Sequence, residues 1–233
     1  MAILTDETVS KYWNWTCKLK MDVMPPKGEC LIDNSDPSLV YLMDPADVSS
    51  STMGELKLDC TQFKITSKQQ ILVPLWIAWC DGNEVGSKHA HYAKKRYNLG
   101  HIQSGVNLDG ASYAKLDVTV SNVDDNISET YETAQRVTTH TSEDRPDLAY
   151  ITIPPESIKL KCPGAKGFSV KEGTISAGFS GWWTLVKLDK LESGIHEISY
   201  QTTVGTDNLP SDSETSPGTP FTSAKITYKL KIV

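Results

Sequence analysis

The chain has 233 residues, of which 23 are Lys or Arg and 29 are Asp or Glu, so its formal net charge is −6. This length fits one large all-β domain or two small ones and buries about 70% of the unfolded surface. The lack of a long run of either charge argues against a nucleic-acid-binding surface and against a polybasic membrane anchor. No membrane span is expected, because the longest apolar stretch, 71–80, is shorter than the ~20 residues required and contains Pro74.

The cellular compartment stays open at this point. Residues 1–13 contain neither the basic nor the apolar region of a signal peptide, so either the protein is cytoplasmic or its export signal has been removed. Disulfides form in oxidising compartments, which makes the cysteines informative. They are Cys17, Cys30, Cys60, Cys80 and Cys162. Their wide spacing permits at most two disulfides, and burial of all five as small apolar residues is the alternative.

An aromatic helix is predicted over residues 7–20, with Asp6 or Thr8 as its N-terminal cap. Its apolar positions recur near the helical period of 3.6 residues. They are Val9, Tyr12, Trp13, Thr16 and Leu19. We expect this helix to pack as a lid over a core, with ligand stacking on its aromatic rings as the alternative.

The rest of the chain is a series of short β-rich segments separated by turn residues. The predicted strands are 56–65, 71–80, 113–123, 148–153 and 224–233. The last one alternates between apolar and polar side chains, which is typical of an antiparallel sheet with one face in water. The segment 71–80 lacks this alternation and is expected to be buried on both faces, with Pro74 at a bulge or a sheet edge.

Three segments interrupt the β pattern. Residues 84–101 and 126–136 can each form a short helix, and residues 206–221 form a long polar loop rich in Pro, Ser and Thr. We find no internal repeat and no linker, so a single domain over residues 1–233 is predicted. The expected fold is mainly β, an antiparallel β-sandwich or jelly roll with an aromatic N-terminal helix and one or two short helices.

His89 and His91 form a pair that could chelate a divalent metal, because residues i and i+2 of a strand share a face. The glycines around them give a superficial likeness to a cupin metal motif. In place of the cupin glutamate, however, residues 93–96 are one alanine and three basic residues, which favours a solvated basic helix or loop with two surface histidines. The histidines that could join the pair in a barrel are His101, His140 and His196. Apart from this pair the sequence indicates no cofactor.

No catalytic residue is assigned. The sequence contains no GxSxG elbow, no cysteine-protease signature, no P-loop and no GxGxxG motif. Asp81 and Glu84, just after a predicted buried strand, are the best-placed carboxylates for a glycosidase pair, but surface acids are the default interpretation.

Residues 181–200 are predicted to form a β-hairpin with tryptophan on both faces. One face carries Trp182, Thr184, Val186 and Leu188, and the other carries Trp183, Leu185 and Lys187. We expect one ring to lie in the core and the other to be covered by the N-terminal helix. His196, on the returning strand, is expected to be hydrogen-bonded rather than catalytic. If aromatic side chains instead contact a ligand, the candidate binding residues are Trp13, Trp15, Trp182, Trp183 and His196.

Six features follow one another along the chain. They are the aromatic helix with Tyr12, Trp13 and Trp15, then Cys30, then Cys60 with the strand 71–76, then ITIPPESI at 151–158, GWWTLVKLDKLESGIHEI at 181–198, and KITYKLKIV at 225–233. Together they resemble a family of mostly exported bacterial and archaeal proteins to which no activity is attached. The resemblance implies a β-sandwich, a disulfide between Cys30 and Cys60, and an extracytoplasmic setting. The chain departs from the family in having Glu192 and Ser193 where two prolines are usual.

Three classes of function are consistent with these observations. The first, which we expect, is a non-catalytic extracytoplasmic protein, periplasmic or secreted, that binds a small molecule, glycan or protein. The second is a jelly-roll, cupin-like metal-dependent enzyme that uses His89 and His91, with His140 or His196 as further candidates, or else a carbohydrate hydrolase. The third is an assembly subunit in which the strand 225–233 lies at a sheet edge and pairs with another chain, although its alternate lysines oppose such pairing.

Overall fold

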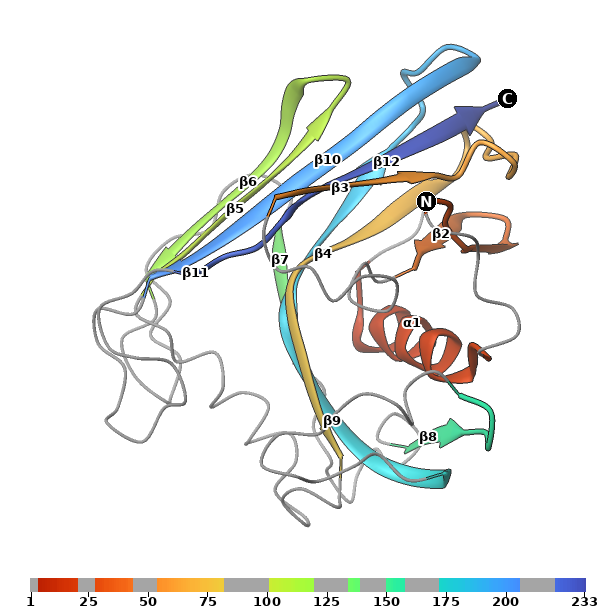
Figure 1. The fold of residues 1–233 in the computed structure, drawn as a ribbon, viewed down its shortest axis with the longest axis vertical. Coiled ribbons are helices and arrows are strands. Elements are labelled where there is room, and N and C mark those ends of the chain that lie inside the picture. Colours follow the sequence, from red (N-terminus) through yellow and green to blue (C-terminus); the bar gives the residue numbers. More distant parts are fainter. Residues whose placement is uncertain are drawn as a thin grey trace.

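The structure, a computed structural model, describes residues 4–20, 28–43, 54–81, 101–119, 134–138, 150–157, 172–205 and 221–233. Within these ranges it contains one α-helix and two β-sheets (Figure 1). The elements are α1 (Asp6–Lys18), β1 (Ile32–Asp36), β2 (Leu39–Leu42), β3 (Glu55–Asp59), β4 (Gln70–Asp81), β5 (His101–Leu108), β6 (Ala111–Thr119), β7 (Gln135–Thr138), β8 (Tyr150–Ile153), β9 (Gly173–Lys187), β10 (Gly194–Gly205), β11 (Phe221–Thr222) and β12 (Lys225–Ile232). The predicted mainly β sandwich with an N-terminal helix is confirmed.

Each sheet combines antiparallel pairs with one parallel pair. Sheet I has the strand order β1-β2-β4-β9-β7, with β8 also pairing with β9. Sheet II has the order β3-β12-β10-β5-β6, with β11 also pairing with β10. The parallel pairs are β2 with β4 and β3 with β12. A parallel pair needs a crossover connection, which period-two alternation does not reveal, so the sequence predicted antiparallel pairing throughout.

Among the described residues, the two large apolar cores produce a three-layer arrangement of helix, sheet I and sheet II. The core between the sheets includes Leu42 and Val73 from sheet I and Ile198 and Leu230 from sheet II. A second core lies between α1 and the opposite face of sheet I, as the position of the helix in Figure 1 illustrates. Sheet I is therefore covered on both faces, whereas sheet II turns its outer face to solvent.

The helix α1 begins one residue earlier than expected and ends at Lys18. Thr5 is its N-cap, because its hydroxyl oxygen accepts a hydrogen bond from the Thr8 N–H at 3.2 Å. The expected caps, Asp6 and Thr8, instead lie inside the helix. Asp6 in the first turn and Lys18 in the last turn carry the charges that the helix dipole favours.

The strand β4 is buried on both faces, as its lack of alternation predicted. Its side chains at Ile71 and Val73 enter the core between the sheets, and Leu72 enters the core under α1. Pro74 lies at a register shift between β4 and β9. A proline has no N–H to donate to a neighbouring strand. At this irregularity the regular pattern of hydrogen bonds is already interrupted, so the proline is tolerated.

The predicted hairpin over residues 181–200 is wrong. The strand β9 pairs with β4, β7 and β8 in sheet I, and β10 pairs with β5, β11 and β12 in sheet II, so the segment 188–193 crosses from one sheet to the other. Both faces of β9 are apolar near its end, which requires a place inside a sheet that is covered on both sides. Alternation along β10, by contrast, suits the sheet with a solvent face.

The strand β12 is not at a sheet edge, which contradicts the edge pairing of residues 225–233 that the third class of function, an assembly subunit, requires. It lies between β10, antiparallel, and β3, parallel. The segment predicted as a strand over 56–65 ends at Asp59, and Ile65 makes only an isolated bridge to Ile232. The expected helices over 84–101 and 126–136, and the loop 206–221, lie largely outside the described residues. At their ends, His101 belongs to β5, Gln135 to β7 and Phe221 to β11.

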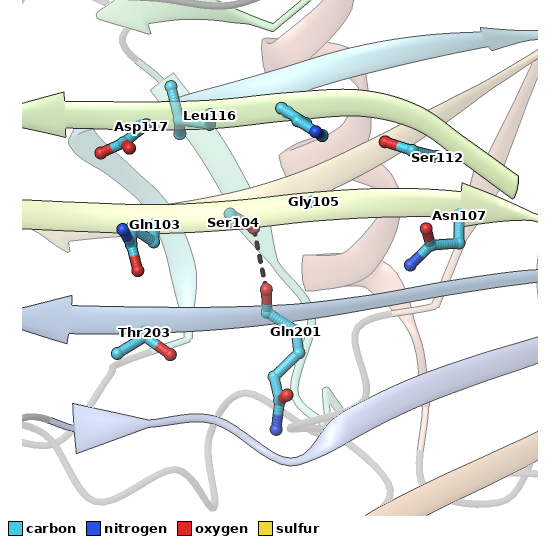
Figure 2. A pocket seen from close by; sticks show the side chains of 10 residues that line it. Gln103, Ser104, Gly105, Asn107, Ser112, Leu116, Asp117, Gln201 and Thr203 are labelled. Carbon is cyan, nitrogen blue, oxygen red and sulfur yellow. Dashed lines mark hydrogen bonds between the residues drawn. The ribbon is translucent and has the colours of Figure 1, made fainter. Parts of the chain in front are cut away.

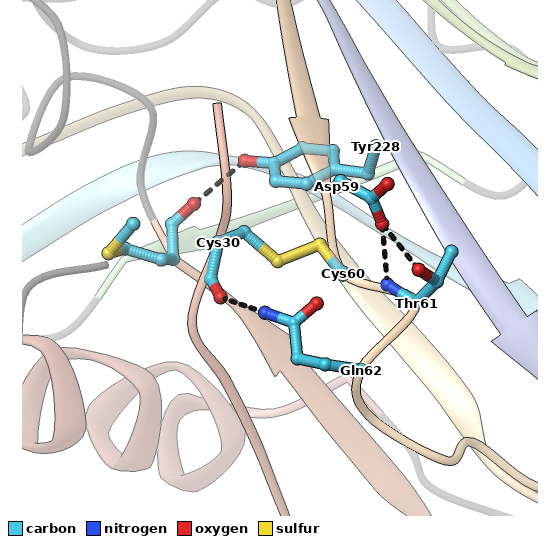
Figure 3. Close-up of a disulfide and its surroundings, with 7 residues drawn as sticks. Cys30, Asp59, Cys60, Thr61, Gln62 and Tyr228 are labelled. Atoms are coloured by element: carbon cyan, nitrogen blue, oxygen red, sulfur yellow. Dashed lines mark hydrogen bonds between the residues drawn. A yellow bond between two sulfur atoms is a disulfide. The ribbon is translucent and has the colours of Figure 1, made fainter. Parts of the chain in front are cut away.

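A disulfide between Cys30 and Cys60 joins the two sheets (Figure 3). Cys30 precedes β1 of sheet I and Cys60 follows β3 of sheet II, with their Cα atoms 5.3 Å apart. The Gln62 side chain donates a hydrogen bond to the Cys30 carbonyl, and the Tyr228 hydroxyl donates to the Met43 carbonyl. The disulfide that the family resemblance implies is thereby confirmed.

Among the described residues, no helix is long and apolar enough to cross a membrane.

Candidate functional site

The tryptophans of the predicted binding set are packed inside the molecule. Trp182 is 3% exposed and lies in the core between the sheets, whereas Trp183 is 1% exposed and lies under α1. The Trp183 ring meets the Tyr12 ring edge-on, with centroids 5.2 Å apart. The prediction that one ring lies in the core and the other under the N-terminal helix is confirmed. Because a buried ring is not accessible to a ligand that approaches from solvent, Trp182 and Trp183 are packing residues.

The two helix tryptophans also serve packing. Trp13 is 2% exposed and belongs to the core under α1. Trp15 is half-buried, and its ring stacks on that of Tyr41 with centroids 6.1 Å apart and an angle of 27° between the planes. The Tyr41 hydroxyl donates a hydrogen bond to the Thr8 carbonyl of the same helix. These contacts attach α1 to β2, which accounts for both rings without a ligand.

The expected metal-binding residues His89 and His91 lie outside the described residues, as do His140 and Glu84. Asp81 is the last residue of β4 and His101 is the first of β5. In the part of the chain that the structure describes, no group of three or more His, Cys, Asp or Glu side chains could hold a metal ion. The metal site and the glycosidase pair therefore stay predictions.

His196 connects three segments of chain through its two ring nitrogens. Its Nδ1 lies 2.7 Å from Oδ2 of Asp109, and its Nε2 lies 2.9 Å from the Glu192 carbonyl oxygen. A carbonyl and a carboxylate both accept, so these two contacts favour the protonated imidazole, in which both ring nitrogens donate. The hydrogen bond to Asp109 raises the pKa of His196 above its ordinary value, against a smaller opposing effect of burial.

Asp109 holds the end of the β5–β6 hairpin against β10. Its Oδ1 accepts a hydrogen bond from the Glu197 N–H at 2.9 Å, and its own N–H donates to the Glu197 carbonyl at 2.8 Å. Although burial works in the opposite direction, the hydrogen bonds from His196 and Glu197 lower the pKa of Asp109. With both ring nitrogens of His196 occupied by acceptors, the pair has no free base to offer a nucleophile, so its role is structural.

The outer face of sheet II carries an open groove of about 750 Å³ over β10, β5 and β6, and most of the residues that line it are polar (Figure 2). Its lining includes Gln103, Asn107, Ser112, Lys115, Asp117 and Gln201. Strand register brings these side chains together, because Gln103 pairs with Asp117 and Asn107 pairs with Ser112. In each pair the two side chains lie on the same face of the sheet. The groove thus presents amides, hydroxyls and one charge of each sign.

Gly105 lies at the centre of the groove, paired with Gln201 on one side and Lys115 on the other. A Cβ atom added there would lie 3.5 Å from the Ala114 carbonyl oxygen, which is an ordinary van der Waals contact. Since its φ is also outside the left-handed region, neither backbone nor packing requires glycine at this position. The absence of a side chain leaves the strand backbone exposed as the floor of the groove.

A hydrogen-bonded chain of hydroxyls fixes the strands behind the groove. The Ser104 hydroxyl lies 2.8 Å from that of Thr202, which in turn donates to the Leu75 carbonyl of sheet I. On the solvent side, the Gln201 side chain donates to the Ser223 carbonyl at 2.9 Å. These bonds hold β5 and β10 to each other and to sheet I, and the ladder with β5 holds β6, so the backbone of the groove is preformed.

Comparisons of the chain with protein-family models, with curated proteins and with solved structures found no match.

Sequence reasoning missed the groove, although one local signal pointed to it. Asp109 and Gly110, with φ of 51° and 81°, form the tight turn between β5 and β6. An Asp-Gly pair between two β-rich segments is a strong hairpin signal, and it predicts that 101–108 and 111–119 are partners. The polar residues on these strands carry no signal of their own, because they match those of any strand with one face in water.

Proposed function

We propose that the protein is a non-catalytic extracytoplasmic binding protein whose ligand lies in the groove on the outer face of sheet II. The observation that carries this proposal is the convergence of hydrogen-bonding side chains from β10, β5 and β6 around the open backbone at Gly105. Because the strand backbone is already ordered by the sheet, a ligand does not have to organise it, and the cost of ordering is limited to the exposed side chains.

The lining of the groove supports binding rather than catalysis. Its described titratable side chains are Lys115 and Asp117. Glycoside hydrolysis requires two carboxyl groups on opposite sides of the reacting bond, and acyl transfer requires a nucleophile beside a base. Amides such as those of Gln103 and Gln201 supply neither group, but they donate and accept hydrogen bonds to a bound molecule.

The disulfide between Cys30 and Cys60 supports the extracytoplasmic part of the proposal. Structural disulfides persist in secreted and periplasmic proteins and are rare where glutathione keeps thiols reduced.

Binding assays on groove variants test the proposal. We expect affinity electrophoresis and calorimetry against panels of polysaccharides and peptides to find a ligand whose affinity falls at least tenfold in Gln103→Ala/Gln201→Ala. The matched control is Lys231→Ala, which changes an exposed side chain on the same sheet outside the groove and should leave affinity unchanged. Equal loss of affinity in both variants, or no loss in either, would contradict the location of the site.

A further inference from the structure

We infer that the ligand of the groove is a neutral, hydroxyl-rich carbohydrate, an inference that rests on the proposed binding function. Three independent features of the described residues favour this class over an anionic polymer and over a peptide. They are the charge of the lining, the chemistry of its uncharged groups and the place of the groove on the sheet.

The charge of the lining favours an uncharged ligand. Lys115 and Asp117 are two residues apart on β6 and therefore lie on the same face of the sheet. A polyanion placed across the groove would be repelled by Asp117 and attracted by Lys115, and a polycation would meet the reverse, so the pair gives neither a net gain. The net charge of −6 on the whole chain adds a further repulsion against anions. A neutral ligand encounters neither cost.

The uncharged groups suit a ligand that is rich in hydroxyls. The amides of Gln103, Asn107 and Gln201 each offer a donor and an acceptor side by side, and the hydroxyls of Ser112 and Thr203 offer both roles in one atom. Neighbouring hydroxyls of a sugar ring likewise donate and accept. Among the described residues, the Gln103 and Asn107 side chains form no hydrogen bond, which leaves these amides available to such a ring.

The place of the groove argues against an extended peptide. Peptides that add to β-sheets do so at an open edge, where main-chain N–H and C=O groups are unpaired. The groove is centred on β5, whose residues pair with β10 on one side and with β6 on the other. A peptide lying over β5 or β10 would therefore find no unpaired main-chain groups with which to extend the sheet, whereas β6, the last strand in the order of sheet II, lies at the rim of the groove. The missing side chain at Gly105 instead leaves room for a sugar ring.

The test uses three classes of probe against the full chain. The neutral probes are mannan, dextran, xylan and galactomannan, the anionic probes are polygalacturonate and dextran sulfate, and the peptide probe is a random dodecapeptide library. We expect binding to a neutral polysaccharide, with a dissociation constant on the order of 0.1–1 mM for short oligosaccharides, because an open polar groove buries little surface.

The decisive variant is Gly105→Leu, whose side chain fills the floor of the groove, with Gly105→Ala as the smaller matched change. We expect at least a tenfold loss of affinity in Gly105→Leu, a smaller loss in Gly105→Ala and none in Lys231→Ala. Thermal melting of each variant shows whether it is folded. If Gly105→Leu fails to fold, the affinity of Gln103→Ala/Gln201→Ala tests the same prediction.

The outcomes separate the two proposals. Binding confined to anionic or peptide probes, and lost in the groove variants, would overturn the carbohydrate inference and leave the binding function standing. Binding of neutral polysaccharide that no groove variant weakens would overturn the assignment of the groove. No binding to any of the three classes would overturn both.

Discussion

The Nδ1 atom of His196 lies 2.7 Å from the Oδ2 atom of Asp109, although 87 residues separate them in the chain. This contact joins the start of β10 to the turn of the hairpin that carries most of the groove. The same histidine also donates to the Glu192 carbonyl in the connection between the sheets. This one side chain thus connects the turn, the strand and the crossover.

The pair predicts a defined dependence of stability on pH. The pKa of His196 is raised above 6.5, so its contribution is fully present below pH 6.5 and is lost as pH rises through the folded-state pKa. The pKa of Asp109 is lowered below 3.8, so its contribution is present above pH 3.8 and is lost as pH falls through its folded-state pKa. The pair therefore stabilises most between these limits.

We expect His196→Ala to lower the free energy of unfolding by about 1 kcal/mol at pH 5.5 and by less at pH 8.5. The figure is kept small because the Asp109 side chain is 45% exposed and solvent screens the interaction. Urea denaturation at the two pH values measures the difference. A loss that is larger at pH 8.5 than at pH 5.5 would show that the protonated histidine is not the stabilising form.

The two glycines of the β5–β6 hairpin should respond differently to alanine. Gly110 has a φ of 81°, which a side chain adopts only with strain, so Gly110→Ala should cost about 1–2 kcal/mol. Gly105→Ala should be neutral or slightly stabilising, because a Cβ atom fits there and alanine has less freedom to lose on folding. Denaturation of both variants under one condition gives the comparison, and equal costs would contradict the described turn.

Removal of the disulfide should destabilise the whole sandwich. Cys30 and Cys60 are 30 residues apart, and opening a loop of that length costs about 3–4 kcal/mol in the chain-entropy model. We expect Cys30→Ala/Cys60→Ala to lower the free energy of unfolding by that amount. Mass spectrometry of the non-reduced protein provides the accompanying check, since free thiols at both positions would refute the pairing and its support for an extracytoplasmic setting.

Trp182 and Trp183 should both be structural. Each is almost fully buried, in a different core, so replacing either by alanine should cost about 3–5 kcal/mol. The milder variants Trp182→Phe and Trp183→Phe should stay folded and should leave ligand affinity unchanged. If a phenylalanine variant is folded but binds with strongly reduced affinity, the tryptophan that it replaces takes part in binding and its role is not purely structural.

The sequence predicted which face of a strand each side chain occupies, but it did not predict which strands pair with each other. Adjacent tryptophans at positions 182 and 183 must point to opposite faces of a strand, and the helix with Tyr12 was the available apolar cover for one of them. The same pattern does not say which strand lies alongside. Residues 181–187 and 194–200 therefore matched a hairpin as well as they match the two sheets that they join.

The groove could not be predicted because it depends on register between distant strands. Gln201 pairs with Gly105, and Gly105 pairs with Lys115. The strands around Gln201 and Lys115 were predicted from the sequence, but the middle strand β5 was not. A bulge between Val106 and Asn107 further shifts the hairpin register. The folded structure is needed to show which polar residues lie together on the outer face of sheet II.

The most direct test of the binding face is a nuclear magnetic resonance titration of isotope-labelled protein with an oligosaccharide from the neutral polysaccharide that it binds. The account predicts that the perturbed backbone amides cluster at 103–107, 112–117 and 201–203. Perturbations centred instead on α1 and β2, around Trp15 and Tyr41, would contradict it.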